Sequence, residues 1–271
     1  MISHNKYVVI DFETTALDPN KNQPVSMAAV MIDGRKLTLC DQGTFYSTIN
    51  YIPDSEVETY NLSKSEKKAM DTHGISIDLL KSSPSLKNVW NNFCNWMKLH
   101  TPKNDQWEYP IFCGHNNLYD KTIANRIMHG HLGGKQILTS KLLTKTKIGK
   151  MDDHELAYEY TQLSCYKEPW KYGPENLFHP VLSIDTYSAM FALFENCREP
   201  QKLSLTALRS FFGFNSEDAH NALVDTLYSA EILIRYLRLL RMVSKDTDFN
   251  VNGEAILPIE KIVKELKECP F

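Results

Sequence analysis

Closely spaced cysteine pairs are missing from this sequence. Its six cysteines are scattered along 271 residues, and none forms a C-x-x-C pair. This spacing argues against a zinc knuckle or a disulfide framework, so we expect a reducing, intracellular setting. Long hydrophobic runs are missing as well, because no segment approaches the roughly 20 apolar residues that a membrane span needs. The apolar stretch near the N-terminus is too short for a signal peptide and is followed at once by an acid.

An excess of positive charge is also missing. The net charge of −3 argues against a generally basic nucleic-acid coat protein. It leaves room for an enzyme that grips nucleic acid through metal ions and a local basic patch. We expect a soluble protein of the cytoplasm, in a bacterial or phage-infected cell, that binds no membrane.

Apolar residues are plentiful, at 42% of the chain, which is enough for a sizeable core. The sequence shows no internal repeat and no low-complexity segment. We expect one α/β domain over residues 1–245 with an insertion at about 131–180. A C-terminal tail, 246–271, contains one candidate for a short helix.

The composition of the first 50 residues is typical of β-strands. Residues 7–11 are β-branched and aromatic, as a buried strand requires. A second strand is expected over 25–33, followed by a break at Gly34 and a third strand over 44–49. Together they predict a three-stranded meander.

Helical patterns follow. Ser63 and Glu66 have the spacing of a capping box. Residues 85–99 place apolar side chains at helical intervals, with Ser85 before them as a cap. Six further elements are expected: a short strand over 110–116 that runs into a helix ending at Gly130, a strand and a helix over 181–194, a short helix over 203–213, and a long amphipathic helix over 221–243.

Two acids, Asp11 and Glu13, stand at the end of the first buried strand. Side chains alternate along a strand, so both point to the same side. Two carboxylates on one face repel each other and lose hydration unless a positive charge lies between them. A pair of Mg²⁺ or Mn²⁺ ions would supply that charge, because two-metal sites need several bridging carboxylates. The alternative is a solvated strand end, where exposed acids are ordinary.

More acids stand at the ends of other elements. Asp120 lies at the head of the helix that follows strand 110–116, and Asp225 lies in the first turns of the long helix. His220 precedes Asp225 by five residues, at the mouth of the same helix. Near neutral pH, histidine is well suited to take a proton from a metal-bound water. The alternative for His220 is a ring that caps the helix or hydrogen-bonds locally.

The segments DFETTALD, GHNNLYD and HNALVD together resemble the three motifs of the DEDD-type 3′–5′ exonucleases, in the subgroup that uses histidine (DEDDh). The segments KKAMDTHGIS, SIDTYSAM and KLSLTALRSFFGF are similar to further parts of that family, in the same order. The resemblance covers residues 5–130 and 181–240. It implies a ribonuclease-H-like fold, a mixed five-stranded sheet with helices on both faces.

The same resemblance implies a set of catalytic residues. It makes Asp11, Glu13, Asp120 and Asp225 the ligands of two Mg²⁺ or Mn²⁺ ions, and His220 the general base. The implied reaction is hydrolysis of the terminal phosphodiester at a 3′ end, with release of nucleoside 5′-monophosphates. The metal ions would stabilise charge on the attacking and leaving oxygens.

The implied substrate is a single-stranded 3′ end, with DNA favoured over RNA. Thr14, Thr15 and Leu17 would line the pocket for the terminal nucleotide, and Asn116 would position the strand. An exoribonuclease acting on RNA ends and a non-catalytic exonuclease-fold binding module stay open as alternatives. Family members also include homodimers and polymerase-bound subunits, which gives two candidate protein partners.

Some residues depart from the family pattern or have a simpler interpretation. Ala16 stands where many relatives have glycine, and Asn117 is bulkier than the small residue often found there. We interpret His115 as a structural hydrogen-bonding residue and His73 as a turn marker after a helix. Asp185 is expected to cap the next helix, with a role near the metal ions as the alternative.

The insertion has its own composition. Five lysines lie between residues 135 and 150 with no acid among them, and five aromatic residues follow. A lysine patch would attract a polyanion, and the rings could stack on bases. A solvated face and a small separate core are the alternatives. The residues are Lys135, Lys141, Lys145, Lys147 and Lys150, then Tyr158, Tyr160, Tyr166, Trp170 and Tyr172.

Overall fold

The computed structural model describes residues 5–19, 22–52, 62–101, 106–128, 177–214 and 220–246. The chain divides into two compact units, Met1–Tyr236 and Leu237–Phe271. Every site discussed below lies in the first unit. Most of the expected insertion, the helix end at Gly130 and the tail after residue 246 lie outside the described residues, so those expectations stay predictions.

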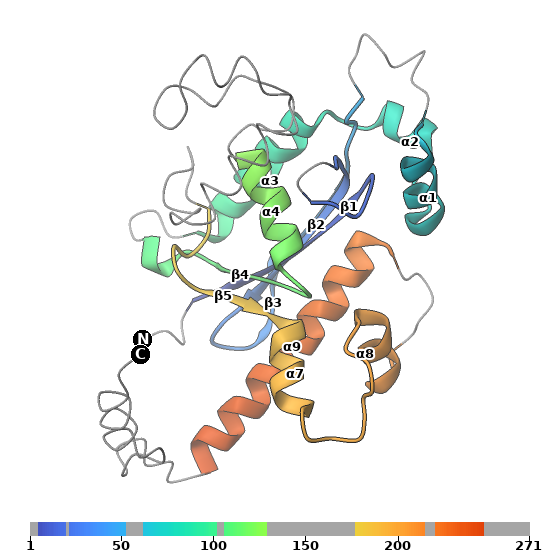
Figure 1. Ribbon diagram of the computed structural model, residues 1–271. Coiled ribbons are helices and arrows are strands. Elements are labelled where there is room, and N and C mark those ends of the chain that lie inside the picture. Colours follow the sequence, from blue (N-terminus) through green and yellow to red (C-terminus); the bar gives the residue numbers. More distant parts are fainter. Residues whose placement is uncertain are drawn as a thin grey trace, which may run out of the picture. The chain divides into compact units, whose positions relative to one another are not determined.

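A mixed five-stranded sheet forms the centre of the first unit, as the sequence predicts (Figure 1). Its strand order is β3-β2-β1-β4-β5. The β2 strand runs antiparallel to both β1 and β3, whereas β4 runs parallel to β1 and to β5. The strands are β1 (Tyr7–Thr14), β2 (Pro24–Asp33), β3 (Thr38–Thr48), β4 (Ile111–Gly114) and β5 (Ser183–Asp185).

The meander of β1, β2 and β3 is present, but β3 begins earlier than residue 44. Thr38 and Leu39 already pair with β2, and an irregularity in register follows between Val30 and Ile32. A bulge of this kind lets one strand absorb extra residues while pairing continues on both sides of it. The break expected at Gly34 is confirmed, because β2 ends at Asp33 and β3 begins at Thr38, whereas residues 38–43 belong to the third strand.

The β1 strand continues through both of its acids to Thr14. Ile10 and Phe12 belong to the large core cluster on one face of the sheet. Because side chains alternate, Asp11 and Glu13 lie on the other face. The carboxylates are thus held by paired backbone rather than by a strand end, since Asp11 pairs with Ala28 and Glu13 with a residue of β2 as well.

Helices α3 (Leu86–His100) and α4 (Leu118–Met128) supply the partners of that core face. They lie next to each other in Figure 1. Phe93 is fully buried and contacts the rings of Trp96 and Phe178. Ser85 caps α3 as expected, accepting a hydrogen bond from the amide of Asn88. This core fixes the position of α4, which carries one of the candidate acids.

Two short helices precede α3. In α1 (Lys64–His73), the capping box is formed: the Ser63 side chain accepts from the Glu66 amide, and the Glu66 carboxylate accepts from the Ser63 amide. The α2 helix (Ile77–Ser82), which the sequence patterns left unassigned, is capped by Ser76 and buries Leu80. Its short length explains why periodicity does not reveal it.

Three further helices group together in Figure 1: α7 (Thr186–Phe194), α8 (Leu205–Phe211) and α9 (Ala222–Asp246). Met190, Leu208 and Ile232 join them in one apolar cluster. Asp185 caps α7, as expected, by accepting from the amides of Tyr187 and Ser188. Among the described residues, no helix has the length and apolar character needed to cross a membrane.

Candidate active site

Asp11 and Glu13 meet the acid of α9 on one face of the sheet. Burial and, secondly, the charge of Asp225 raise the pKa of Asp11 to about 7. Burial likewise raises the pKa of Glu13 to about 9, with contributions from Asp11 and then Asp225. The charge of Asp225 therefore acts on both acids of β1, and the charge of Asp11 acts on Glu13, as expected for carboxylates on one side of a sheet.

Asp120 lies in the first turn of α4 and is only 3% exposed. Its Oδ1 accepts a hydrogen bond from the backbone N–H of Phe12 at 3.0 Å. This bond attaches the start of α4 to the middle of β1, directly between the two acids of that strand. Burial raises the pKa of Asp120 well above its usual value, and the charge of Asp11 adds to the effect.

Asp225 lies in the first turn of α9, and both of its oxygens are engaged. Oδ1 accepts from Nη1 of Arg209 at 3.0 Å, and Oδ2 accepts from the backbone N–H of His220 at 3.1 Å. Burial raises the pKa of Asp225, while the His220 amide and the Arg209 guanidinium lower it. The sequence patterns did not single out Arg209. The available signal is a single charged residue in a short helix that otherwise has none.

His220 stands at the entry to α9 with an exposed side chain and a left-handed backbone, φ 66°. Asn221 caps the helix instead, because its Oδ1 accepts from the amides of Leu223 and Val224. His220 therefore contributes a backbone N–H to Asp225, and its ring has no hydrogen-bond partner among the described residues. The imidazole is free to act on a bound molecule.

His73 and His115 differ in their surroundings. His115 is a structural residue, as expected: its ring nitrogens contact Thr186 Oγ1 at 3.0 Å and the Leu203 carbonyl at 2.8 Å. His73 ends α1 and accepts from the Ile75 amide. Burial lowers its pKa to about 4, and the charge of His220 contributes. His73 therefore lies near the candidate base, which its sequence context does not indicate.

Thr15 attaches the loop after β1 to Gln23, the residue just before β2. The Thr15 amide donates to the Gln23 carbonyl at 2.9 Å, and Thr15 Oγ1 accepts from the Gln23 amide at 3.0 Å. Thr14 and Thr15 are both buried, whereas Leu17 is 91% exposed. Of the three residues expected to line a nucleotide pocket, Leu17 alone presents its side chain to solvent.

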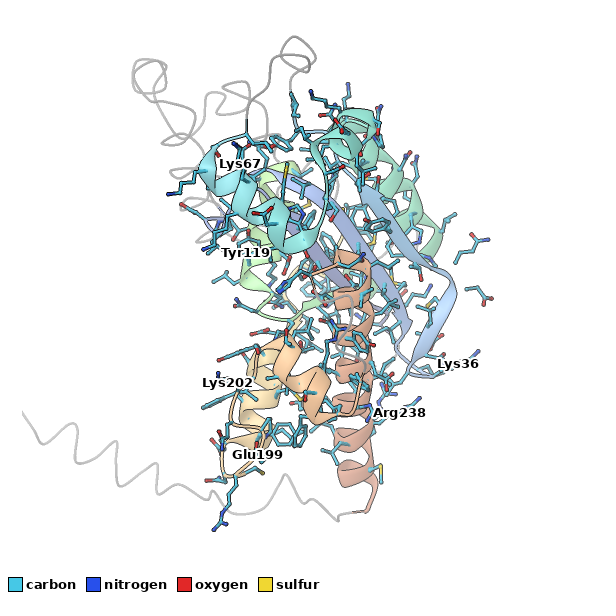
Figure 2. The ribbon with its side chains drawn as sticks, turned by 90° about the vertical axis from the view of Figure 1, so that its right-hand side faces the viewer. Lys36, Lys67, Tyr119, Glu199, Lys202 and Arg238 are labelled. Carbon is cyan, nitrogen blue, oxygen red and sulfur yellow. The ribbon has the colours of Figure 1, made fainter. Side chains whose placement is uncertain are left out.

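A polar clamp, made by Asn22, Tyr119 and Arg126, holds this loop against α4. The Ala16 carbonyl accepts from the Tyr119 hydroxyl at 2.9 Å and also from Asn22 Nδ2. Nη1 of Arg126 donates to the Pro19 and Asn22 carbonyls at 2.8 and 2.7 Å. Figure 2 shows Tyr119 on α4. The clamp makes the Ala16 turn rigid without a glycine.

Asn116 joins the ends of β4 and β5. Its backbone is left-handed, φ 61°, and its amide donates to Asp185 Oδ1 at 2.7 Å. The Asn116 side chain is exposed, as a substrate contact requires, whereas Asn117 is buried. The wide Asn117 side chain is thus accommodated inside the protein.

The donor set suits a divalent cation of the Mg²⁺ or Mn²⁺ type, which prefers carboxylate oxygens. Asp11, Glu13, Asp120 and Asp225 come from β1, α4 and α9, and each raises the pKa of another or has its own raised by one. Within the described ranges, however, no three histidine, cysteine or acidic side chains already form a cluster that could hold an ion. Carboxylates gathered on one face repel one another, so a bound cation would relieve that repulsion.

The mixed five-stranded sheet with its flanking helices defines a ribonuclease-H-like fold. The sequence model of the RNase T exonuclease family matches residues 8–167, which is more than half of the chain. This chain therefore belongs to the RNase T exonuclease family. No protein with a curated description matches it.

Solved structures are similar to the chain in fold. Cell-death related nuclease 4 has a TM-score of 0.56 and 15% identity, with 88% of this chain and 65% of that one covered. E. coli exonuclease I with single-stranded DNA, in a zinc-bound form, has a TM-score of 0.55 and 13% identity. The match covers 88% of this chain and 43% of exonuclease I. The nuclease domain of 3′hExo, described as a DEDDh family member bound to rAMP, has a TM-score of 0.51 and 16% identity. The match covers 87% of this chain and 92% of that domain. These likenesses confirm the ribonuclease-H-like fold.

Proposed function

We propose that this protein is a divalent-metal-dependent 3′–5′ exonuclease that acts on single-stranded nucleic acid, with DNA favoured over RNA, and releases nucleoside 5′-monophosphates. One observation carries the proposal: four acids from three elements lie close enough to perturb one another, beside an exposed histidine with a free ring. Family membership supports the exonuclease class.

The acids would hold two Mg²⁺ or Mn²⁺ ions. Bound at this site, such ions supply the positive charge that stabilises the attacking and leaving oxygens of the phosphodiester. Asp11 and Glu13 contribute from β1, Asp120 from α4 and Asp225 from α9. A general base must accept a proton at an unblocked nitrogen, and His220 offers one at the mouth of α9.

The substrate end would lie over the loop that follows β1. Leu17, which is 91% exposed, would pack against the terminal base, and Thr14 and Thr15 would shape the turn beneath it. The exposed side chain of Asn116 would contact the strand. In support, one similar structure is a complex with single-stranded DNA, and another is bound to rAMP. An exoribonuclease is the second candidate, since that rAMP complex belongs to a protein of the same fold.

The first experiment uses matched single strands of DNA and RNA with a 5′ label. We expect a ladder that shortens from the 3′ end with Mg²⁺ or Mn²⁺ and no cleavage with EDTA. The faster substrate decides between DNA and RNA. With the label at the 3′ end instead, released fragments longer than mononucleotides would indicate an endonuclease. Intact strands with folded, metal-loaded protein would overturn the proposal in favour of a non-catalytic binding module.

A further inference from the structure

Arg209 is the buried charge that the proposed chemistry leaves unused. It projects from α8, and its side chain is 1% exposed. Arginine is almost never fully buried unless it is paired. Its guanidinium lies over the ring of Tyr228, with 4.2 Å between the central carbon and the ring centroid. Stacking on one side and an ion pair at Nη1 give this group a defined plane.

The ion pair joins Arg209 to a candidate metal ligand. Nη1 donates to Oδ1 of Asp225 at 3.0 Å, and the Asp225 side chain is 14% exposed. The other carboxylate oxygen accepts the backbone N–H of His220 at 3.1 Å. Two donors, one on each oxygen, therefore restrain the Asp225 carboxylate and the left-handed backbone of His220.

Such an ion pair has a geometric rather than a stabilising effect. A buried pair contributes little net stability, because both ions lose their hydration. Groups that orient a metal ligand, in contrast, commonly change metal affinity or activity by about 10- to 100-fold when they are removed. The positive charge of Arg209 also repels a cation. Removal of Arg209 would therefore weaken metal binding if its orienting effect is larger, and would strengthen metal binding if its repulsion is larger.

We propose that Arg209 is a positioning residue, whose guanidinium holds the Asp225 carboxylate in the orientation that a divalent cation needs and, through it, the backbone of His220. This inference rests on the proposed function, because it treats Asp225 as a metal ligand. It adds a residue from α8 to a site otherwise built from β1, α4 and α9.

The test measures Mn²⁺ binding by isothermal titration calorimetry, with the kcat and KM of oligonucleotide cleavage as a second readout. Arg209→Gln keeps an amide donor and removes the charge, and we expect Mn²⁺ to bind about 10-fold more weakly. Arg209→Lys keeps the charge and loses the planar fork, and we expect a loss of about 3-fold. In both variants we expect kcat to fall. KM should change less than twofold, because the loop after β1, where the substrate end would lie, is unchanged.

Arg235→Gln is the matched control. Arg235 also stacks on aromatic rings, at 4.8 Å from the Phe214 ring centroid, and pairs with an acid, Glu231 at 2.8 Å. Within the part of the chain that the structure describes, Arg235 pairs with Glu231 and with aromatic rings and not with any of the four acids. Its loss should leave Mn²⁺ affinity and kcat unchanged, although the melting temperature falls. A purely structural role for Arg209 would give the same pattern.

Each result has a defined meaning. Wild-type or tighter Mn²⁺ affinity in Arg209→Gln would overturn the inference while leaving the proposed function intact. Should Arg209→Gln fail to fold, Arg209→Lys carries the test, and wild-type affinity in that variant would overturn it. If neither the wild-type protein nor Asp225→Ala binds Mn²⁺, the proposed metal site is wrong, and this inference is wrong with it.

Discussion

At the scale of single residues, the site shows how environment changes ordinary side chains. Asp11, Asp120 and Glu13 all have raised pKa values because burial and neighbouring acids disfavour their charged forms. His220 differs because it lies exposed at a helix entry, where Asn221 does the capping. A cation bound among these acids would be the largest local charge in the site, and it would favour the charged form of each carboxylate.

Asp11→Asn should lower kcat by about 10³-fold or more, since removal of one ligand takes away several kcal/mol of charge stabilisation. Its melting temperature without metal should not fall, because one source of repulsion is gone. Activity assays and thermal denaturation with EDTA check both points. Asp33→Asn, which changes an exposed acid that bonds the Arg35 and Lys36 amides, is the control. Wild-type turnover in Asp11→Asn would contradict the site.

His220→Ala should reduce kcat by about 10²–10⁴-fold, the usual cost of losing a general base. Mn²⁺ affinity should stay near the wild-type value, because the backbone N–H that Asp225 accepts is still present. Rapid-quench kinetics and calorimetry measure the two quantities. His100→Gln serves for comparison, since that ring contacts the Gln42 carbonyl. Equal losses in both histidine variants would argue against a specific role for His220.

At the scale of secondary-structure elements, the active site depends on three attachments. Asp120 joins α4 to β1, the polar clamp joins the loop after β1 to α4, and Asp185 joins β5 to the turn at Asn116. Each attachment connects residues that are far apart in the sequence. Elements that are rigid relative to one another keep catalytic groups in place, so we expect changes at these bonds to act on substrate binding.

Tyr119→Phe tests the polar clamp. It removes the hydroxyl that donates to the Ala16 carbonyl, so the loop that carries Leu17 becomes less ordered. We expect KM to rise about 3- to 10-fold with a smaller change in kcat, because an ordering cost of about 1 kcal/mol moves into substrate binding. Steady-state kinetics with a short oligonucleotide measure this.

Tyr51→Phe is the matched control for the clamp. It also removes one tyrosine hydroxyl that donates a hydrogen bond, here to Glu66 Oε1 at 2.8 Å, beside α1 rather than at the loop. Both variants should lose about 0.5–1.5 kcal/mol of unfolding free energy. Only Tyr119→Phe should change KM, and identical KM values would show that the clamp does not order the substrate site.

At the scale of the whole molecule, the crowded acids link stability to pH. The pKa of Asp11 is raised from 3.8 to about 7, and that of Glu13 from 4.5 to about 9. The folded state therefore binds more protons than the unfolded state between these values. Stability without metal is thus greatest at low pH in this window and falls as pH rises, by up to about 1.4 kcal/mol per pH unit for each group.

Denaturation by urea in EDTA, from pH 5 to pH 9, measures this dependence. Glu13→Gln should make the fall above pH 7 less steep, because Glu13 still titrates in that range. Mg²⁺ should stabilise the protein more at pH 9 than at pH 5, because cations compete with protons for the same oxygens. A flat profile in wild-type protein would contradict the raised pKa values.

The sequence by itself determined the local structure and the identity of the candidate acids. Alternation placed Asp11 and Glu13 on one face of β1, and the capping patterns located the starts of α1 and α3. These features depend on neighbours within a few residues, which is why they can be predicted from a pattern. The motif resemblance supplied the fold, which family membership and similar structures confirm.

Only the tertiary structure decided which distant groups support those acids. The contact of Arg209 with Asp225, the clamp at Ala16 and the closeness of His73 to His220 all join separate elements. No local pattern encodes them, because they follow from how α8 packs on α9, α4 on the sheet and α1 beside the site. The sequence names the reacting groups, and packing determines their charge and orientation.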